Sequence, residues 1–189
     1  LEQQGSGVLS VLEGDVFDSI VLGEVRPGVW MPGSDRFNRT ETNQGDWPAQ
    51  TEPEMICVAI VYEGNTIRLY RDGKLAVSYD LDQPCAFGED AYATVGWRHA
   101  NKGFFAGAVE EARIYDKALT GEQIAALKPA PAEDAGAQVG NPIALWTFED
   151  GTPRDQGGYF PECVLQNGAR IETGRLVLDG ANDYLGPKP

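Results

Sequence analysis

Aromatic side chains in loop-like sequence carry the first chemical signal of this chain. The four aromatics are Trp30, Trp47, Tyr159 and Phe160, and the planar hydrogen-bonding side chains of Asn38 and Arg39 stand near the first two. Sugars dock in concave apolar sites in which a few polar groups fix their orientation. The pattern therefore predicts a carbohydrate site built from these residues. The alternative is that the loop aromatics fill the ends of a folded core and contact no ligand.

Signals for catalysis and for a bound cofactor are weak. The single histidine, His99, stands beside Arg98 in a polar stretch, and no Gly-x-Ser-x-Gly elbow supplies a nucleophile for a Ser-His-Asp triad. No glycine-rich phosphate loop occurs, so no nucleotide is expected. The three cysteines form no C-x-x-C or C-x-x-C-H spacing, so neither haem nor a zinc site is predicted. We expect a protein that is not an enzyme.

Charge and hydropathy exclude two classes of partner. The 189 residues hold 15 Lys and Arg against 29 Asp and Glu, a net charge of −14, with a pI near 4.4. A phosphate backbone is repelled by such a surface, so no nucleic acid is expected. No apolar run approaches the ~20 residues of a membrane helix, so no membrane insertion is expected.

The cysteines favour thiols that pack or pair rather than bind metal. Cys57 lies in the apolar run 55–62, where a thiol behaves as a small hydrophobe. If a disulfide exists, Cys85 with Cys163 is the better pair, because both lie in loops flanked by proline. The cysteines do not decide the compartment.

Short strands separated by turns must position the aromatic residues. Apolar and polar residues alternate, or apolar residues run continuously, over 8–12, 16–22, 55–62, 66–70, 74–79, 92–97 and 104–115. Gly14-Asp15 and Asp72-Gly73 read as hairpin turns. Residues 24–54 form a long loop with a short strand near 29–31, and such loops are usually functional or mobile. Trp97 and Trp146 fall in strands and are expected in the core.

One helix and a linker follow the strands. Thr120 and Gln123 fit a capping box that begins a short helix. Residues 129–142 are rich in Pro, Ala and Gly and predict a linker. The strand pattern returns over 143–148, 163–165, 170–171 and 175–178. Many short strands with one helix predict an all-β fold, an antiparallel two-sheet sandwich.

Several stretches of the chain then resemble segments of a known family. Phe104–Thr120, with an acidic pair, an Arg-aliphatic-Tyr strand and a small helix, resembles the closing strand of laminin-G-like, concanavalin A-like jelly rolls. Val58–Tyr62 followed by Leu69–Gly73 resembles their central hairpin. Trp30–Ser34 with Arg39-Thr40, and Gly96–His99, are similar to the module of planctomycete cytochrome c-type multidomain proteins. The resemblance implies a jelly-roll sandwich over most of the chain.

The order of the segments departs from that family. Ile143–Gly151 and Leu176–Leu185 resemble opening strands, yet they stand at the C-terminus, and a further strand that would join them to Leu1 is absent. Either the chain is circularly permuted, or it is cut across two tandem modules and leaves an open sheet edge. We expect the first, because so short a segment scarcely holds a core. Residues 1–128 then form the main part, 129–142 the linker, and 143–189 the completing segment.

The resemblance also implies a metal and, more weakly, a catalytic strand. Related domains often bind Ca²⁺, which needs six to eight oxygen ligands. The candidate ligands here are Asp150, Asp155, Glu110, Glu111 and Asp183, unless these carboxylates are simply solvated. Glu13–Asp18 resembles the acidic strand of jelly-roll glucanases, in which two carboxylates flank the scissile bond. Here a glycine interrupts the strand, and Gly14-Asp15 reads better as a turn.

These observations favour a non-catalytic binding module for polysaccharide, extracellular or periplasmic and calcium-assisted. The first alternative is a structural or protein–protein interaction module that joins neighbouring domains or subunits through an open sheet edge. The second is a glycan-active hydrolase. The inference of function rests largely on analogy at the level of the fold.

Overall fold

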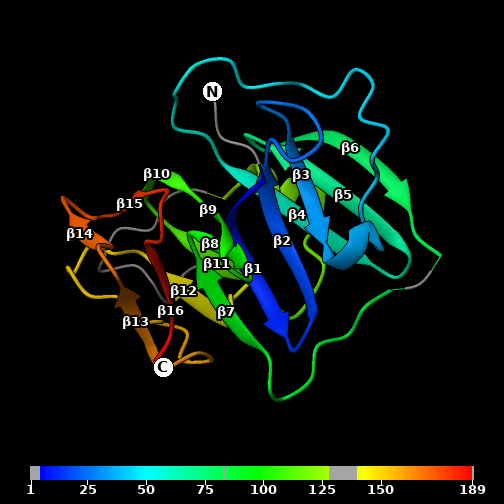
Figure 1. Ribbon diagram of the computed structural model, residues 1–189. Helices are drawn as coiled ribbons and strands as arrows, with labels where there is room; N and C mark the ends of the chain where they lie inside the picture. Colours follow the sequence, from blue (N-terminus) through cyan, green and yellow to red (C-terminus); the bar gives the residue numbers. More distant parts are fainter. Residues whose placement is uncertain (1–4, 83, 128–139, 189) are drawn as a thin grey trace.

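The computed structural model describes residues 5–82, 84–127 and 140–188. Its largest sheet is antiparallel and six-stranded, in the order β13-β16-β7-β1-β2-β3 (Figure 1). These strands are β13 (Cys163–Gln166), β16 (Tyr184–Pro187), β7 (Tyr92–Val95), β1 (Ser6–Glu13), β2 (Val16–Leu22) and β3 (Trp30–Ser34). The predicted all-β fold of antiparallel sheets is confirmed.

Smaller antiparallel ladders form the opposite layer. One holds β10 (Ala106–Val109), β15 (Arg175–Asp179) and β14 (Arg170–Glu172); a second holds β11 (Ala112–Ile114) and β12 (Ala144–Trp146); a third holds β4 (Val58–Glu63), β5 (Thr66–Arg71) and β6 (Lys74–Asp80). A separate hairpin of β8 (Trp97–His99) and β9 (Lys102–Phe104) packs on β1.

Two apolar clusters hold the layers together. The main core contains buried side chains of both layers, among them Leu22, Val95, Leu185, Leu69, Trp146 and Leu176. The helix-side cluster is smaller and consists of Val61, Tyr70, Leu119 and Ile124, with Ala59, Tyr115 and Leu127 packed against them. Helix α1 (Gly121–Ala125) supplies Ile124 to it. This α-helix is too short to cross a membrane, and no other helix among the described residues is long and apolar enough to do so.

Local sequence signals are confirmed at the turns and at the helix start. The hairpin of β5 and β6 turns at Asp72 and Gly73, whose φ angles of 50° and 75° are the positive values this turn requires. Gly14-Asp15 also joins β1 to β2 as a two-residue turn, in which Gly14 has a positive φ of 58°. The Thr120 hydroxyl accepts a hydrogen bond from Gln123 N–H while the Gln123 side chain accepts one from Thr120 N–H, which is the predicted capping box.

Strands from the C-terminal segment share ladders with strands from the first part of the chain. β12 pairs with β11, β15 with β10, and β16 with both β13 and β7. The predicted linker 129–142 lies almost entirely outside the described residues.

Some expectations about burial and pairing are wrong. The continuous apolar run 55–62 was expected to form one strand, and an apolar run of this kind implies burial, yet β4 begins at Val58, Cys57 is exposed and Met55 is 54% exposed. The reason is that β4 pairs only with β5 among the described strands. The stretch 104–115 is not one strand, because the chain leaves β15 and joins β12 at Glu110-Glu111.

The predicted disulfide and the expected burial of the two strand tryptophans can be compared with the structure. Cys57, Cys85 and Cys163 are all free, so Cys85 and Cys163 form no bridge in this structure. Trp146 is buried as expected, whereas Trp97 is only half-buried and does not belong to the main core.

Candidate functional site

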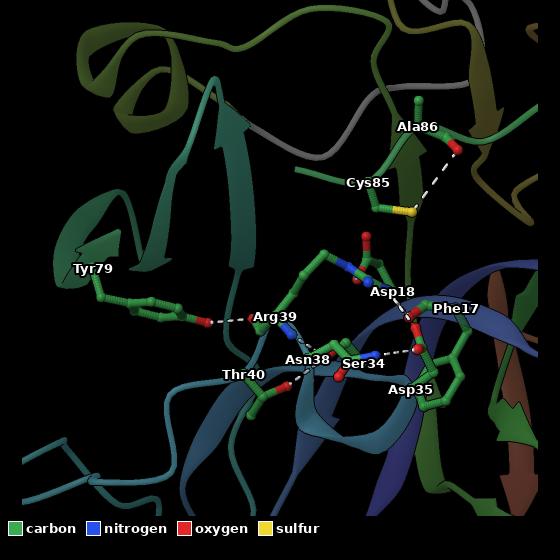
Figure 2. Close-up of polar contacts among 10 residues, drawn as sticks. All are labelled: Phe17, Asp18, Ser34, Asp35, Asn38, Arg39, Thr40, Tyr79, Cys85 and Ala86. Atoms are coloured by element: carbon green, nitrogen blue, oxygen red, sulfur yellow. Dashed lines mark hydrogen bonds and ion pairs between the residues drawn. The ribbon is translucent and has the colours of Figure 1, made fainter. Parts of the chain in front are cut away.

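A buried arginine organises the loop that follows β3. The Arg39 side chain donates through Nε to Asp18 Oδ1 at 2.8 Å, and through Nη2 to Asp35 Oδ1 at 2.6 Å and to the Phe17 carbonyl at 3.0 Å (Figure 2). Asp18 lies in β2, and Asp35 begins the short 3-10 helix η1 (Asp35–Phe37). Because Arg39 is only 7% exposed, it is a structural cation rather than a free binding group.

Burial and pairing act in opposite directions on the two carboxylates. Burial raises the pKa of Asp18, and the hydrogen bond and charge of Arg39 only partly offset this. Burial also acts to raise the pKa of Asp35, but there the bond to Arg39 outweighs it and the pKa is lowered. Burial alone would lower the pKa of Arg39, yet the two carboxylates raise it, so the guanidinium stays charged.

The arginine backbone and its neighbours are fixed by further hydrogen bonds. Arg39 N–H donates to Ser34 Oγ at 2.8 Å, and the Ser34 hydroxyl lies 3.0 Å from the Thr40 hydroxyl. The exposed amide of Asn38 donates to Asp35 Oδ2 at 2.8 Å. The buried ion pairs therefore hold Asn38 and Thr40 in a defined geometry at the surface.

Those two residues form one wall of an open polar hollow. The hollow is lined by Asn38, Thr40, Glu41, Tyr79, Asp80, Leu81 and Asp82. Tyr79 comes from β6, and its hydroxyl donates to the Arg39 carbonyl at 3.0 Å. The Trp47 ring stacks on Tyr79, with centroids 6.2 Å apart and an interplanar angle of 25°. We call this the Asn38–Tyr79 hollow; it combines amide, hydroxyl and carboxylate groups with an aromatic ring.

Phe37, which precedes Asn38 in the chain but does not line the hollow, is an exposed aromatic residue that the sequence reasoning missed. It is 43% exposed and stands next to Asn38, and both Phe37 and Arg36 adopt positive φ, 58° and 50°. Such backbone in residues other than glycine is costly and clusters at ligand sites. An aromatic residue beside Asn38 in a loop was the available sequence signal.

The predicted carbohydrate residues divide between the hollow and other places. Asn38 lines it, Arg39 supports it and Trp47 stacks on its tyrosine. Trp30 is buried in the main core, and its indole N–H donates to Gln50 Oε1 at 2.8 Å, so its ring has no free face for a sugar. Its position in β3, rather than in a loop, is the reason.

Tyr159 and Phe160 lie together, but no described contact joins them to the hollow. Tyr159 is 57% exposed and meets the Phe160 ring edge-on at 4.9 Å. Phe160 stacks on buried Trp146 at 6.1 Å. Phe160 therefore packs against the core, and Tyr159 is the exposed member of the pair.

The predicted calcium ligands do not form a calcium site among the described residues. Asp155 is buried, and its two carboxylate oxygens accept hydrogen bonds from the backbone N–H groups of Leu145, Gly157 and Phe160 at 2.7–2.8 Å. Asp183 is also buried and accepts from the N–H groups of Gly168 and Asp179. Both carboxylates fasten turns, so their oxygens already have partners.

The three remaining predicted calcium ligands, Asp150, Glu110 and Glu111, also have partners within the protein. Asp150 accepts from Thr152 N–H and hydroxyl, Glu110 pairs with Arg175 at 3.3 Å, and Glu111 pairs with Arg113. Within the described part of the chain, no three His, Cys, Asp or Glu side chains lie close enough to hold a metal ion. The five carboxylates do not fit the six to eight oxygen ligands that calcium takes.

The acidic strand that resembles a glucanase motif is engaged in internal contacts. Glu13 Oε2 accepts a hydrogen bond from Gly88 N–H at 2.7 Å, and Asp18 accepts from Arg39. Gly14-Asp15 is a turn between strands. Neither carboxylate is free of a protein partner.

A second aromatic surface was not predicted. Trp97 lies 5.1 Å from Tyr184 and 6.4 Å from Phe104, measured between ring centroids, and Phe104 lies 6.2 Å from Tyr184. All three rings are half-buried. Strands β8, β9 and β16 supply them from distant parts of the sequence, so spacing along the chain carries no signal of this patch.

Comparison with known proteins agrees with this architecture. The model of the concanavalin A-like lectin/glucanases superfamily in its laminin-G form matches residues 25–125, more than half of the chain. Neither the comparison with curated proteins nor that with solved structures finds a match. The matched range includes Arg39, the whole Asn38–Tyr79 hollow and the hairpin of β5 and β6. The chain belongs to the concanavalin A-like lectin/glucanases superfamily.

Proposed function

We propose that this chain is a non-catalytic carbohydrate-binding module and that the Asn38–Tyr79 hollow is its sugar site. The observation that carries the proposal is the stacked pair of Trp47 and Tyr79 beside the polar groups of Asn38 and Thr40. A sugar presents hydroxyls to amides and carboxylates, and Asn38 and the three acidic residues of the hollow are such partners, with the Tyr79 side chain among the lining residues. The hollow is open, which suits a long polymer rather than an enclosed small molecule.

The charge of the hollow narrows the class of sugar. Three carboxylates line it, from Glu41, Asp80 and Asp82, on a chain of net charge −14. Carboxylates accept hydrogen bonds from hydroxyls but repel other anions. The ligand we propose is a neutral polysaccharide, not a uronate or a sulfated glycan. Such polymers are encountered outside the cytoplasm, so we propose an extracellular or periplasmic location.

A glycan array probed in the presence of Ca²⁺ and again in EDTA tests the proposal. Binding of neutral glycans under both conditions is expected, because the predicted calcium carboxylates are occupied by protein donors. Binding lost in EDTA would instead restore the prediction of calcium-assisted recognition. If no glycan on the array bound, or if only sulfated glycans bound, the assignment of the hollow as a site for neutral sugars would be overturned.

Matched variants locate the site once a glycan binds. Asn38→Ala removes an exposed amide that lines the hollow, and Tyr159→Ala removes an exposed aromatic side chain that lies outside it. We expect isothermal titration calorimetry to show about a tenfold weaker Kd for the first variant, since the loss of one hydrogen bond to ligand approaches 1.4 kcal/mol. If Asn38→Ala left the Kd unchanged and Tyr159→Ala weakened binding, the sugar site would instead lie at Tyr159 and Phe160.

A second candidate function is protein–protein association through an open sheet edge. The observation that favours it is that β4, an apolar strand, pairs with β5 on one side and with no described strand on the other. The hydrolase hypothesis has no such support and stays a prediction.

A further inference from the structure

A second open hollow lies where the start of β1, the hairpin of β8 and β9 and the end of β15 meet. Its volume is about 400 Å³, within the range of small-molecule sites. It shares no lining residue with the Asn38–Tyr79 hollow, and in Figure 1 its strands β9, β10 and β15 lie on the other side of the molecule from β6. Its polar lining residues are Ser6, Asn101, Lys102 and Asp179. We call it the Ser6–Asp179 hollow.

The polar side chains of this hollow have hydrogen-bonding capacity to spare. Among the described residues, no hydrogen bond or ion pair engages the Ser6 hydroxyl, the Asn101 amide or the Lys102 ammonium group. Asp179 uses one carboxylate oxygen, Oδ1, which accepts from Ala181 N–H at 2.7 Å. Its other oxygen, Oδ2, has no partner in the same part of the chain. Side chains from three distant segments thus bring together four groups that a ligand can engage.

Ser6 is the most informative of these groups, because it is only 3% exposed and still borders the hollow. Leaving a buried hydroxyl without a partner is unfavourable, and such groups are rare in folded proteins. An exposed amide or ammonium group, by contrast, is satisfied by bulk water at no cost. The buried serine therefore distinguishes this hollow from an ordinary polar surface, and a ligand hydroxyl seated there would give it a partner.

Two glycines let the walls of the hollow approach each other closely. Gly103 has a φ of 77°, and a Cβ at this position would lie 2.9 Å from the Gly5 carbonyl oxygen. Gly180 has a φ of 79°, and a Cβ there would lie 2.7 Å from Ala106 Cβ. These contacts leave the backbone little room to move. A site that is already in place before the ligand arrives loses little conformational freedom on binding.

Aromatic residues brace the hairpin that carries two of the polar groups. Phe104 lines the hollow, and its ring lies 6.4 Å from that of Trp97, measured between centroids. The Trp97 indole N–H donates to the Ala100 carbonyl at 2.8 Å. This bond fixes the turn between β8 and β9, so Asn101 and Lys102 are presented from a defined backbone.

Charges of opposite sign in the hollow select an uncharged ligand. The Lys102 ammonium group attracts anions that the Asp179 carboxylate repels, and the reverse holds for cations. Lys102 and Asn101 donate hydrogen bonds, the carboxylate accepts them, and the Ser6 hydroxyl does both. A sugar residue carries several hydroxyls, each a donor and an acceptor, and can engage all four groups. A zwitterionic amino acid has only two polar ends.

We propose that the Ser6–Asp179 hollow is a second sugar site, which holds a single neutral sugar residue. The inference rests on the proposed function for its class of ligand, but it concerns a separate site. A site for one residue is weak, with a Kd in the millimolar range, so retention on a polymer still depends on the Asn38–Tyr79 hollow. The two sites together let one module hold two stretches of polymer at once, which raises its avidity for long chains.

Titrations followed by NMR distinguish the two hollows, because backbone amides report on each of them. The probes are the methyl glycosides of glucose, galactose, mannose and N-acetylglucosamine, added to the full chain at millimolar concentration, with L-alanine as the zwitterionic comparison. At least one glycoside is expected to shift the amide signals of Gly103, Gly180 and Ala181 along a saturating curve. Glu41 and Leu81 report on the Asn38–Tyr79 hollow in the same spectra.

The pattern of shifts decides between the possible outcomes. If no glycoside gave saturating shifts at Gly103, Gly180 and Ala181, or if L-alanine alone did so, the proposal would be overturned. Saturating shifts confined to Glu41 and Leu81 would also overturn it, while leaving the proposed function intact. Saturating shifts confined to the Ser6–Asp179 hollow would support it and would remove the sugar from the first hollow.

Variants of the polar groups separate ligand contact from folding. Ser6→Ala removes a hydroxyl without a described protein partner, so the midpoint of thermal unfolding should stay unchanged while the Kd at this hollow rises about tenfold. Lys102→Met should also weaken binding there by about tenfold. Lys117→Met, which removes an exposed lysine outside both hollows, is the matched control and should change neither site. An unchanged Kd for both Ser6→Ala and Lys102→Met would contradict the proposal.

Discussion

The Tyr79 hydroxyl donates a hydrogen bond of 3.0 Å to the backbone carbonyl of Arg39, 40 residues earlier in the chain. This bond ties β6 to the loop after β3, and it closes the Asn38–Tyr79 hollow at the point where Arg39 is anchored by Asp18 and Asp35. The proposed sugar site thus depends on a contact between two layers of the sandwich that no local sequence pattern contains.

Separating the ring of Tyr79 from its hydroxyl tests this relationship. Tyr79→Phe keeps the ring beside Trp47 and removes the bond to Arg39, so we expect a loss of about 1 kcal/mol in the free energy of unfolding and a modest loss of glycan affinity. Tyr79→Ala removes the ring as well and should abolish glycan binding. Urea denaturation and calorimetry measure the two effects. A Tyr79→Ala variant that binds glycan like the original chain would exclude the ring from the site.

Trp47 is the second aromatic residue on which the proposal depends. Trp47→Ala removes the ring that stacks on Tyr79, and we expect glycan binding to be lost while the fold is kept, because Trp47 is half-buried and packs against the main core without being one of its fully buried residues. A pull-down on the best glycan from the array, alongside a thermal melt, measures both. Intact affinity would remove this loop from the site.

Arg39 is expected to be the most sensitive position of the loop. Arg39→Met leaves the carboxylates of Asp18 and Asp35, whose side chains are only 11% and 16% exposed, without their cation, which should cost about 3 kcal/mol at pH 7. Guanidinium denaturation measures this loss. Asp18→Asn, which keeps a hydrogen-bond acceptor for Arg39 Nε and leaves Asp35 in place, should cost much less. Equal losses for the two variants would contradict the role of Arg39 as the shared counter-ion.

The same variant should show an inverted dependence on pH. In the original chain Asp35 has a lowered pKa, so its stabilising contribution is present above the ordinary carboxylate pKa and is lost as the pH falls through the lowered value. Without Arg39, burial would raise the pKa of both carboxylates. The variant would then be most stable below the ordinary carboxylate pKa, where both groups are protonated, and would lose stability as the pH rises through the raised pKa values. The stability gap between Arg39→Met and the original chain should therefore narrow from pH 7 to pH 4.5. A gap that widens would show that the carboxylates are not buried.

The thiols should differ strongly in reactivity. Cys57 is exposed, whereas Cys163 is buried and burial, together with the charge of Asp155, raises its pKa to about 11. Since the thiolate is the reactive form, iodoacetamide at pH 8 should label Cys57 well before Cys163 in the folded protein. Mass spectrometry of tryptic peptides follows both sites. Comparable rates would mean that the segment containing β13 opens readily.

Local features of this fold could be read from the amino-acid sequence because nearest neighbours along the chain create them. The turns at Gly14-Asp15 and Asp72-Gly73 and the capping box at Thr120 each need only adjacent residues, and all were predicted correctly. Alternating apolar residues likewise placed most strands. Family membership followed from the closing-strand motif.

Burial, by contrast, depends on contacts between segments far apart in the chain, and only the folded molecule reveals it. The sequence placed Trp30 in a loop and Trp97 in the core, yet the first is buried in the main core and the second meets Phe104 and Tyr184 near the surface. The sequence predicted Asp155 to be a metal ligand, but in the structure its carboxylate accepts hydrogen bonds from three backbone N–H groups. The apolar pattern of β4 predicts an interior strand, but the number of neighbours that a strand has is a property of the sheet. Pairing across the sandwich, not spacing along the chain, sets the geometry of the proposed sugar site.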